Sequence, residues 1–313
     1  MVKSLIGFVK KESMLCISFL LALVSMAFVP IDHKYIGYID FHTLIILLSL
    51  MIITAGLRGL GVFTAIGRWM LNKTRSVRGI AAVLVLLCFV FSMVITNDVA
   101  LITFVPLAIE VLAMAGLEKY MILIIVLQTI ASNLGSMLTP IGNPQNLFLF
   151  SISNMSPGGF IALMLPYTLL SFIGLIVCIL LIGKASPATV QVGGMAISNK
   201  KKTAVYLALF LFALTSVARI VPGYIVLAVI LAVVIVMDFR VLIKPDFSLL
   251  LTFIFLFVFI GNMKSIPEIN SWLYEMIHGN ELLASVLASQ IISNVPAAVL
   301  LSGFTGNIPA LIV

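Results

Sequence analysis

Apolar runs of about twenty residues recur along this chain, and they constrain its fold more than any other feature. The longest uncharged run extends from Tyr120 to Gly183 and contains no Asp, Glu, Lys, Arg or His. Charged residues make up 9% of the chain and hydrophobic residues 62%, whereas a soluble domain carries about 25% charged residues. A helix needs about 20 apolar residues to cross the hydrocarbon core of a bilayer. The sequence therefore predicts an all-α polytopic membrane protein whose surroundings are the lipid bilayer.

The apolar runs divide into simple spans and three irregular stretches. The run at 119–155 is too long for one crossing, and the runs at 79–116 and 281–303 each carry a polar interruption in the middle. We predict simple spans near 14–30, 41–57, 159–183, 203–219, 223–237 and 247–263.

The basic residues indicate the orientation of these spans. With the N-terminus in the cytoplasm, 15 of the 18 lysines and arginines fall in inner segments, and only Lys34, Arg219 and Lys264 fall outside. Cytoplasmic loops of membrane proteins carry such an excess. We therefore predict a multi-pass protein of the cytoplasmic membrane with a cytoplasmic N-terminus. The net charge of +7 is then a topology signal, and we expect no nucleic-acid partner.

A polar linker at 184–202 divides the chain into a first part, 1–183, and a second part, 203–313. Each part contains a similar stretch, FSMVITNDVALITFVPL at 91–107 and ASQIISNVPAAVLLSGF at 288–304. Five predicted crossings lie between the two stretches, so the second stretch enters the membrane from the opposite face. This arrangement indicates an inverted repeat, the architecture with which secondary transporters alternate access.

The two polar interruptions are predicted to be hairpin tips. The arm from Glu281 to Ser293 spans only about 20 Å as a helix, against a core of about 30 Å. We therefore predict a re-entrant outer hairpin at 281–303 with Ser293, Asn294 and Pro296 at its tip, although a simple joint between two tilted helices is the alternative. By similarity, 79–116 is predicted to be an inner hairpin.

The inner tip is predicted to consist of Thr96, Asn97 and Asp98. The alternative is an external turn between two ordinary spans, because each arm of this stretch is long enough to cross. If the tip is buried, Asp98 is a carboxylate within the membrane, and such a group usually marks an ion or proton path.

The run at 119–155 contains the motif SNLGSMLTPIGNPQN. Pro140 and Pro144 each remove a backbone donor and disfavour helix in the preceding residue, so 139–146 is not expected to be continuous helix. Unwound backbone at membrane depth can bind cations and an anionic substrate. An external loop followed by a short amphipathic helix is the alternative.

The succession VITNDVALITFVPL, SNLGSMLTPIGNPQN and IISNVPAAVLL resembles the ion transporter superfamily, in particular its divalent anion:sodium symporter branch and the related arsenite permeases. The resemblance covers nearly the whole chain and implies a homodimer. It implies that a small anionic substrate is bound between the two tips and that a sodium ion is bound at Asn97 and Asn143. The residues implied to form the sites are Thr96, Asn97 and Asp98 at one tip, Ser293, Asn294 and Val295 at the other, and Thr139, Gly142, Asn143 and Asn146 in the first unwound loop, shaped by Pro140 and Pro144.

The chain departs from the pattern of the symporter branch in two ways. Asp98 and Val295 replace the expected threonine at the third tip position, and an Asn-Asp tip is closer to the arsenite permeases. The chain also ends at Val313, 19 residues after Asn294, so a second unwound helix is expected to be missing from a truncated permease.

These observations predict a secondary transporter for a di- or tricarboxylate or an inorganic oxyanion, coupled to sodium or protons. The alternatives are an arsenite-type exporter, a sodium/proton antiporter or a nonfunctional truncated permease. No HExxH or GxSxG motif occurs, so we expect no enzyme and no cofactor beyond a coupling sodium ion.

Overall fold

A computed structural model describes residues 2–182 and 197–313 of the chain, with side chains from residue 7 onward. The described residues form helices and no strand, and seven of these helices are long and apolar enough to cross a membrane. This confirms the predicted all-α polytopic membrane protein. Most of the predicted linker 184–202 lies outside the described residues.

The chain forms two compact units, each described here by itself. Unit 1 comprises residues 1–48, 147–154 and 245–313, and unit 2 comprises residues 49–146 and 155–244. Helices α4 (Phe41–Gly59) and α9 (Pro144–Ile152) contribute residues to both units. These units are defined by compactness in space, whereas the predicted repeats are consecutive parts of the sequence on either side of 184–202. The division into repeats stays a prediction.

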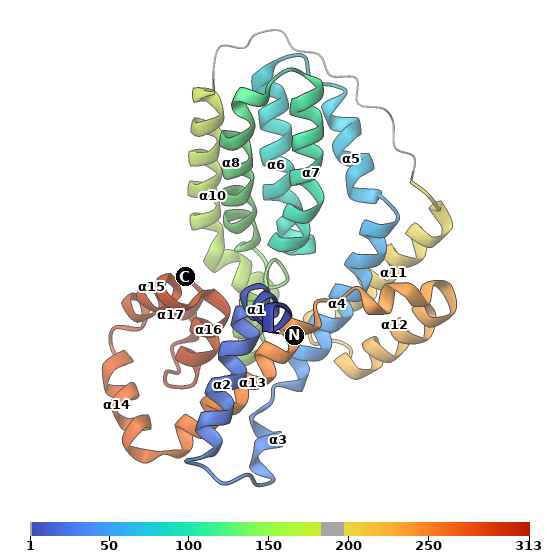
Figure 1. Cartoon of the computed structure of the whole chain (residues 1–313). Helices are drawn as coiled ribbons and strands as arrows, with labels where there is room; N and C mark the ends of the chain where they lie inside the picture. Colours follow the sequence, from blue (N-terminus) through green and yellow to red (C-terminus); the bar gives the residue numbers. More distant parts are fainter. Residues whose placement is uncertain (1, 183–196) are drawn as a thin grey trace. The chain divides into compact units, whose positions relative to one another are not determined.

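In unit 2, helices α6, α7, α8 and α10 pack side by side (Figure 1). Gly135 of α8 lies so close to α6 that a Cβ atom there would be 2.0 Å from the carbonyl oxygen of Phe89. Buried Gln128, two turns earlier on α8, donates to the carbonyl oxygens of Leu84 and Phe104 at 3.2 and 3.3 Å. The helices of unit 2 are α5 (Val62–Leu71), α6 (Val77–Ile95), α7 (Asn97–Met114), η1 (Glu118–Tyr120), α8 (Met121–Ser136), α10 (Pro157–Leu181), α11 (Lys200–Val217), α12 (Gly223–Asp238) and η2 (Phe239–Ile243).

In unit 1, the long helix α13 packs against α2 and α16. Phe19 and Phe255 meet edge to face at 5.1 Å, and buried Asn262 donates to Ser25 Oγ at 2.9 Å. Polar pairs of this kind join helices in a bilayer, where apolar surface alone drives no association between helices. The helices of unit 1 are α1 (Val2–Lys11), α2 (Ser13–Met26), α3 (Lys34–Tyr38), α13 (Phe247–Ser265), α14 (Pro267–Ile277), α15 (Glu281–Ile292), α16 (Asn294–Ser302) and α17 (Ile308–Ile312).

The observed helices follow most of the predicted spans and correct others. The span predicted at 14–30 is only the 14-residue helix α2 (Ser13–Met26), which is short for a crossing. The segment 58–78, where no span is predicted, contains helix α5 (Val62–Leu71). Ten residues are too few to appear as a span, and the helix buries only one side, through Val62, Phe63, Gly67 and Leu71.

The irregular stretches are broken where the sequence predicts. The stretch 79–116 forms two helices that meet at Thr96, and 281–303 forms two shorter ones that meet at Ser293. Helices α15 and α16 have 12 and nine residues, about 18 and 14 Å of helix, against a hydrocarbon core of about 30 Å. The depth of either tip in the bilayer stays a prediction.

Candidate functional site

Both hairpins turn at a single residue with the same unusual backbone conformation. Thr96 has φ 74° and ψ 151°, and Ser293 has φ 73° and ψ 157°. This region is adopted almost only by glycine, and a residue with a side chain held there costs about 1–3 kcal/mol. Such strain persists only where the surrounding structure determines the backbone, and it clusters at functional sites. The two tips therefore share one local structure, built on Thr96 in unit 2 and on Ser293 in unit 1.

The first tip contacts residues 137–143 between α8 and α9, which we call the unwound segment. The backbone N–H of Asn97 donates to the carbonyl oxygen of Gly142 at 3.0 Å. Ser132 Oγ donates to the carbonyl oxygen of Asn97 at 2.7 Å, and Thr139 Oγ1 donates to that of Met93. Hydrogen bonds donated by the tip, by α8 and by the unwound segment therefore hold the tip against the unwound segment.

Two buried asparagines stabilise the unwound segment. The side-chain nitrogen of Asn146 lies 3.4, 3.2 and 3.2 Å from the carbonyl oxygens of Ser136, Met137 and Thr139. For Ser136 and Met137 the amide replaces the backbone donor of a continuous helix. The Thr139 carbonyl also accepts the backbone N–H of Gly142 at 3.3 Å. The side chain of Asn143 accepts from the backbone N–H of Asn146 at 2.8 Å and donates to Ser136 Oγ at 3.2 Å.

Glycine and proline shape the same segment. A Cβ atom on Gly142 would lie 2.0 Å from the carbonyl oxygen of Ser136, so this position accepts no larger residue without rearrangement. Pro140 and Pro144 are both buried. Helix α9 begins at Pro144 itself, because proline is favoured in the first helical position, where its missing N–H is not needed. The predicted break at 139–146 therefore ends earlier than expected.

One acceptor at the first tip lacks a donor. Asn97 Oδ1 is buried, and none of the described residues donates a hydrogen bond to it, whereas Asn97 Nδ2 donates to Asn133 Oδ1 at 3.2 Å. A buried acceptor without a partner costs about 1–3 kcal/mol, and an amide oxygen is a hard ligand suited to a small cation. Asn143 Oδ1 already accepts one hydrogen bond. Asn97 Oδ1 is therefore the freer candidate ligand for a small cation, and sodium binding at these two residues stays a prediction.

Asp98 and the residues of the second tip differ in their exposure. Asp98 lies in the first turn of α7 and is exposed, where a carboxylate is favoured by the helix dipole. Ser293 and Asn294 are exposed and Pro296 is buried in unit 1. The structure thus brings together Thr96, Asn97, Thr139, Gly142, Asn143 and Asn146 within unit 2, and it describes Ser293 and Asn294 only within unit 1. Their roles in binding stay predictions.

Sequence reasoning missed three residues that complete the first tip. Ser132 and Asn133 both hydrogen-bond to Asn97, and Ser136 bonds with Asn143. Ser132 and Ser136 are one helical turn apart, with Gly135 beside them, so small and polar side chains share one face of α8. That spacing within SNLGSMLTPIGNPQN is the signal that could have identified a face packed against the hairpin.

Comparison with known proteins gives matches along nearly the whole chain. Residues 8–312 match the family described as "Citrate transporter". The chain is 33% identical to the inner membrane protein YbiR of Escherichia coli (strain K12) over 288 residues, which are 88% of this chain and 75% of that protein. It is 35% identical to the uncharacterized transporter MJ0456 of Methanocaldococcus jannaschii over 276 residues, 86% of this chain and 73% of that protein. The silicon efflux transporter LSI3 of Oryza sativa subsp. japonica is 28% identical over 183 residues, 55% of this chain and 37% of that protein.

Proposed function

This chain belongs to the citrate transporter family, and we propose that it moves a small anion across the cytoplasmic membrane, driven by a gradient of sodium ions or protons. The family and its relatives make it a multi-pass membrane transporter. The proposal adds the substrate class, a di- or tricarboxylate or an inorganic oxyanion, the coupling ion, and alternating access as the mechanism.

The unpartnered oxygen of Asn97 is the observation that supports coupling to a cation. A sodium ion at Asn97 Oδ1 would satisfy this buried acceptor and would add positive charge beside the tip. The charge would favour an anion that receives hydrogen bonds from nearby hydroxyl and amide groups. Binding of ion and anion would then support each other, which is the energetic basis of symport.

The two tips also support an inverted repeat. Thr96 and Ser293 have φ values of 74° and 73°, and both tips continue with Asn at the start of the next helix. Two related tips facing opposite sides of the membrane would give the protein two alternating routes to one site.

Transport into proteoliposomes tests the proposal. We expect uptake of radiolabelled succinate, citrate, sulfate or phosphate when an inward gradient of sodium ions or protons is imposed, and little uptake without one. Asn97→Ala should remove sodium dependence, because it deletes the proposed ligand, while Gln145→Ala serves as a control on the neighbouring helix α9. The proposal is wrong if none of these anions moves under either gradient.

An oxyacid exporter coupled to protons is the second candidate. Asp98 at the first tip supplies a carboxylate that could carry a proton, and one relative is named a silicon efflux transporter. Everted vesicles, whose cytoplasmic face is outside, should then accumulate arsenite or silicic acid with a proton gradient, and Asp98→Asn should abolish the dependence on that gradient. Sodium-dependent anion uptake that survives Asp98→Asn would exclude this candidate.

We further propose that the N-terminus is cytoplasmic and that the protein forms a homodimer. Labelling of engineered cysteines in intact cells tests the first point: a cysteine at Lys10 should be protected from an impermeant reagent and one at Lys34 should react. Light scattering of the detergent-solubilised protein tests the second, with a mass of one chain as the contrary result.

A further inference from the structure

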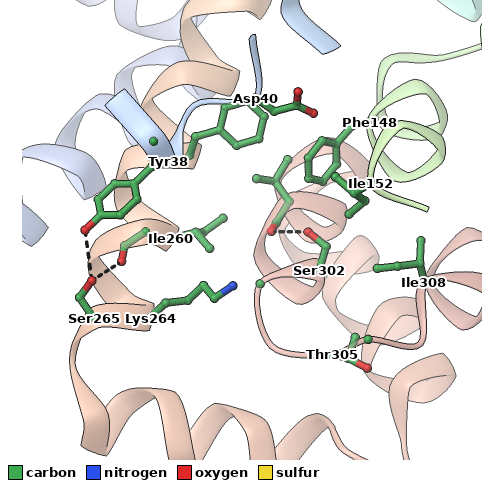
Figure 2. Close-up of a pocket in the computed structure, with 16 residues that line it drawn as sticks. Tyr38, Asp40, Phe148, Ile152, Ile260, Lys264, Ser265, Ser302, Thr305 and Ile308 are labelled. Carbon is green, nitrogen blue, oxygen red and sulfur yellow. Dashed lines mark hydrogen bonds between the residues drawn. The ribbon is translucent and has the colours of Figure 1, made fainter. Parts of the chain in front are cut away.

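Unit 1 contains a cavity of 640 Å³, and no residue of the first tip lines it. Its walls come from α13, α16 and the residues that follow α16, together with the α3–α4 connection and the end of α9 (Figure 2). Small-molecule sites typically measure about 300–1,000 Å³. At about 30 Å³ for each water molecule, the cavity holds on the order of twenty waters or a small organic ion with part of its hydration shell.

Lys264 brings a positive charge into this cavity. Figure 2 shows its side chain extending from α13 into the open space toward the wall that carries Ser302. Among residues 2–182 and 197–313, no ion pair or hydrogen bond to the Lys264 ammonium group is formed. Lys264 is exposed, so water reaches its ammonium group, whose charge and three N–H donors are not used by the described residues.

The serine hydroxyls of the cavity walls already form hydrogen bonds within the protein. Ser265 Oγ donates to the carbonyl oxygen of Gly261 at 2.9 Å and lies 3.1 Å from the hydroxyl of Tyr38. Ser302 Oγ donates to the carbonyl oxygen of Val299 at 2.9 Å. None of these hydroxyls neutralises Lys264, and their remaining lone pairs line a polar space around it.

The acidic groups of Asp40 and Glu281 accept hydrogen bonds from neutral groups. Asp40 accepts hydrogen bonds from both Thr43 Oγ1 and Ser151 Oγ, the latter at 2.8 Å, and from the Thr43 backbone N–H at 3.1 Å. Figure 2 shows its carboxylate pointing away from Lys264. Glu281 is not among the residues that line the cavity. It accepts a hydrogen bond from Thr305 Oγ1 at 3.4 Å and lies 3.9 Å from His278 Nδ1. The donors to Asp40 are neutral, so the lining carries one basic and one acidic side chain, Lys264 and Asp40. Among the described residues these two form no ion pair with each other.

We infer that the cavity around Lys264 is a second anion-binding site, which takes a small carboxylate or phosphate oxyanion. The ammonium supplies the charge and up to three hydrogen bonds, and the cavity leaves room for the rest of the ligand. The inference goes beyond the proposed transport reaction and does not need it, because the site shares no residue with the first tip.

Carbon-13 NMR of dimethylated lysines tests the inference on the unsubstituted protein. Reductive methylation keeps the positive charge and labels each lysine, and the Lys264 signal is identified by its absence in Lys264→Arg. Succinate and inorganic phosphate should each move this signal until it saturates, whereas sodium chloride at equal ionic strength and neutral succinamide should not. Lys34 is the matched control, since it lies in the same unit and is also exposed, but its ammonium is 3.8 Å from Asp32.

Binding of succinate measured by calorimetry gives the second readout. Lys264→Gln should weaken binding at this site by about tenfold or more, the usual loss for a hydrogen bond to a charged group. Lys34→Gln and Asn97→Ala should leave it unchanged, and Asn97→Ala alone reports on the proposed transport site. Adding phosphatidylglycerol to the neutral detergent distinguishes the sources, because a lipid phosphate would saturate the Lys264 signal and exclude succinate.

Two results would overturn the inference. One is a Lys264 signal that responds to succinate, phosphate and phosphatidylglycerol no more than to sodium chloride. The other is an equal loss of succinate binding in Lys34→Gln and Lys264→Gln, which would indicate only a general effect of surface charge. The NMR result stands even if Lys264→Gln proves unstable, because it is recorded on the unsubstituted chain.

Discussion

Replacement of Asn146 by alanine should destabilise the protein through the unwound segment. The Asn146 amide faces three carbonyl oxygens, at 3.2, 3.2 and 3.4 Å, and an amide has two N–H donors. Two hydrogen bonds are therefore lost, and Asn146 is 5% exposed, so water does not readily replace them. Each buried carbonyl left without a donor costs about 1–3 kcal/mol. We expect a loss of about 2–4 kcal/mol in the free energy of unfolding.

This magnitude is large enough to distinguish the proposed role from an ordinary polar contact. Side-chain hydrogen bonds between membrane helices average only about 0.6 kcal/mol, because the groups find other partners. The Thr139 carbonyl keeps the Gly142 N–H at 3.3 Å. The carbonyls of Ser136 and Met137 accept no backbone N–H from the described residues outside the helices, so we expect no such rescue for these two.

Thermal unfolding in detergent measures the effect. Cys88 is buried, so a thiol-reactive dye reports its exposure as the protein unfolds. A loss of about 2–4 kcal/mol should lower the apparent Tm of Asn146→Ala by roughly 4–16 °C, from about 2–4 °C per kcal/mol for chains of this general size. Gln145→Ala is the control, because the Gln145 side chain forms no hydrogen bond with the described residues. Equal Tm values for the two variants would refute the reasoning.

Three further predictions use the same unfolding assay. Gly142→Ala should lower the Tm by several degrees, because the new Cβ would lie 2.0 Å from a backbone oxygen. Gly158→Ala is the control and should change the Tm little, because nothing lies within 4 Å of its new Cβ. Similar Tm values for both variants would contradict the packing argument. At Thr96 and at Ser293, glycine should be more stable than alanine by about 1 kcal/mol, since only glycine adopts these backbone angles without strain; alanine of equal stability would show that the tips are not strained. Arg68 Nη2 lies 2.9 Å from Glu110. A double-mutant cycle with Arg68→Gln and Glu110→Gln should therefore give a coupling free energy of about 0.2–1 kcal/mol. A coupling of zero would show that the pair does not help join α5 to α7.

The positions of the long helices could be predicted because they follow from local properties. The thickness of the hydrocarbon core sets the length of an apolar run, so the span predicted at 247–263 is found as Phe247–Ser265. Helix α5 escaped prediction because ten residues give no such signal. One side of α5 packs against other helices of unit 2, and a count of hydropathy along the chain does not report such packing.

The breaks in the helices were predictable to within a few residues. Pro140 and Pro144 prevent continuous helix whatever surrounds them, and the polar residues at Thr96 and Ser293 interrupt apolar runs. The backbone angles at the two tips could not be predicted, because a non-glycine residue adopts them only when tertiary contacts hold it there.

The sequence by itself determined the membrane class, the helical content, the position of the breaks and the family, because each depends on the order and polarity of consecutive residues. The tertiary structure alone decided which polar groups have partners. Asn146 satisfies carbonyls up to ten residues away, Asn97 keeps a buried oxygen without a donor, and Lys264 lines a cavity without forming an ion pair among the described residues. Hydrogen bonds and ion pairs depend on distances of about 3 Å, and only folding brings distant residues that close.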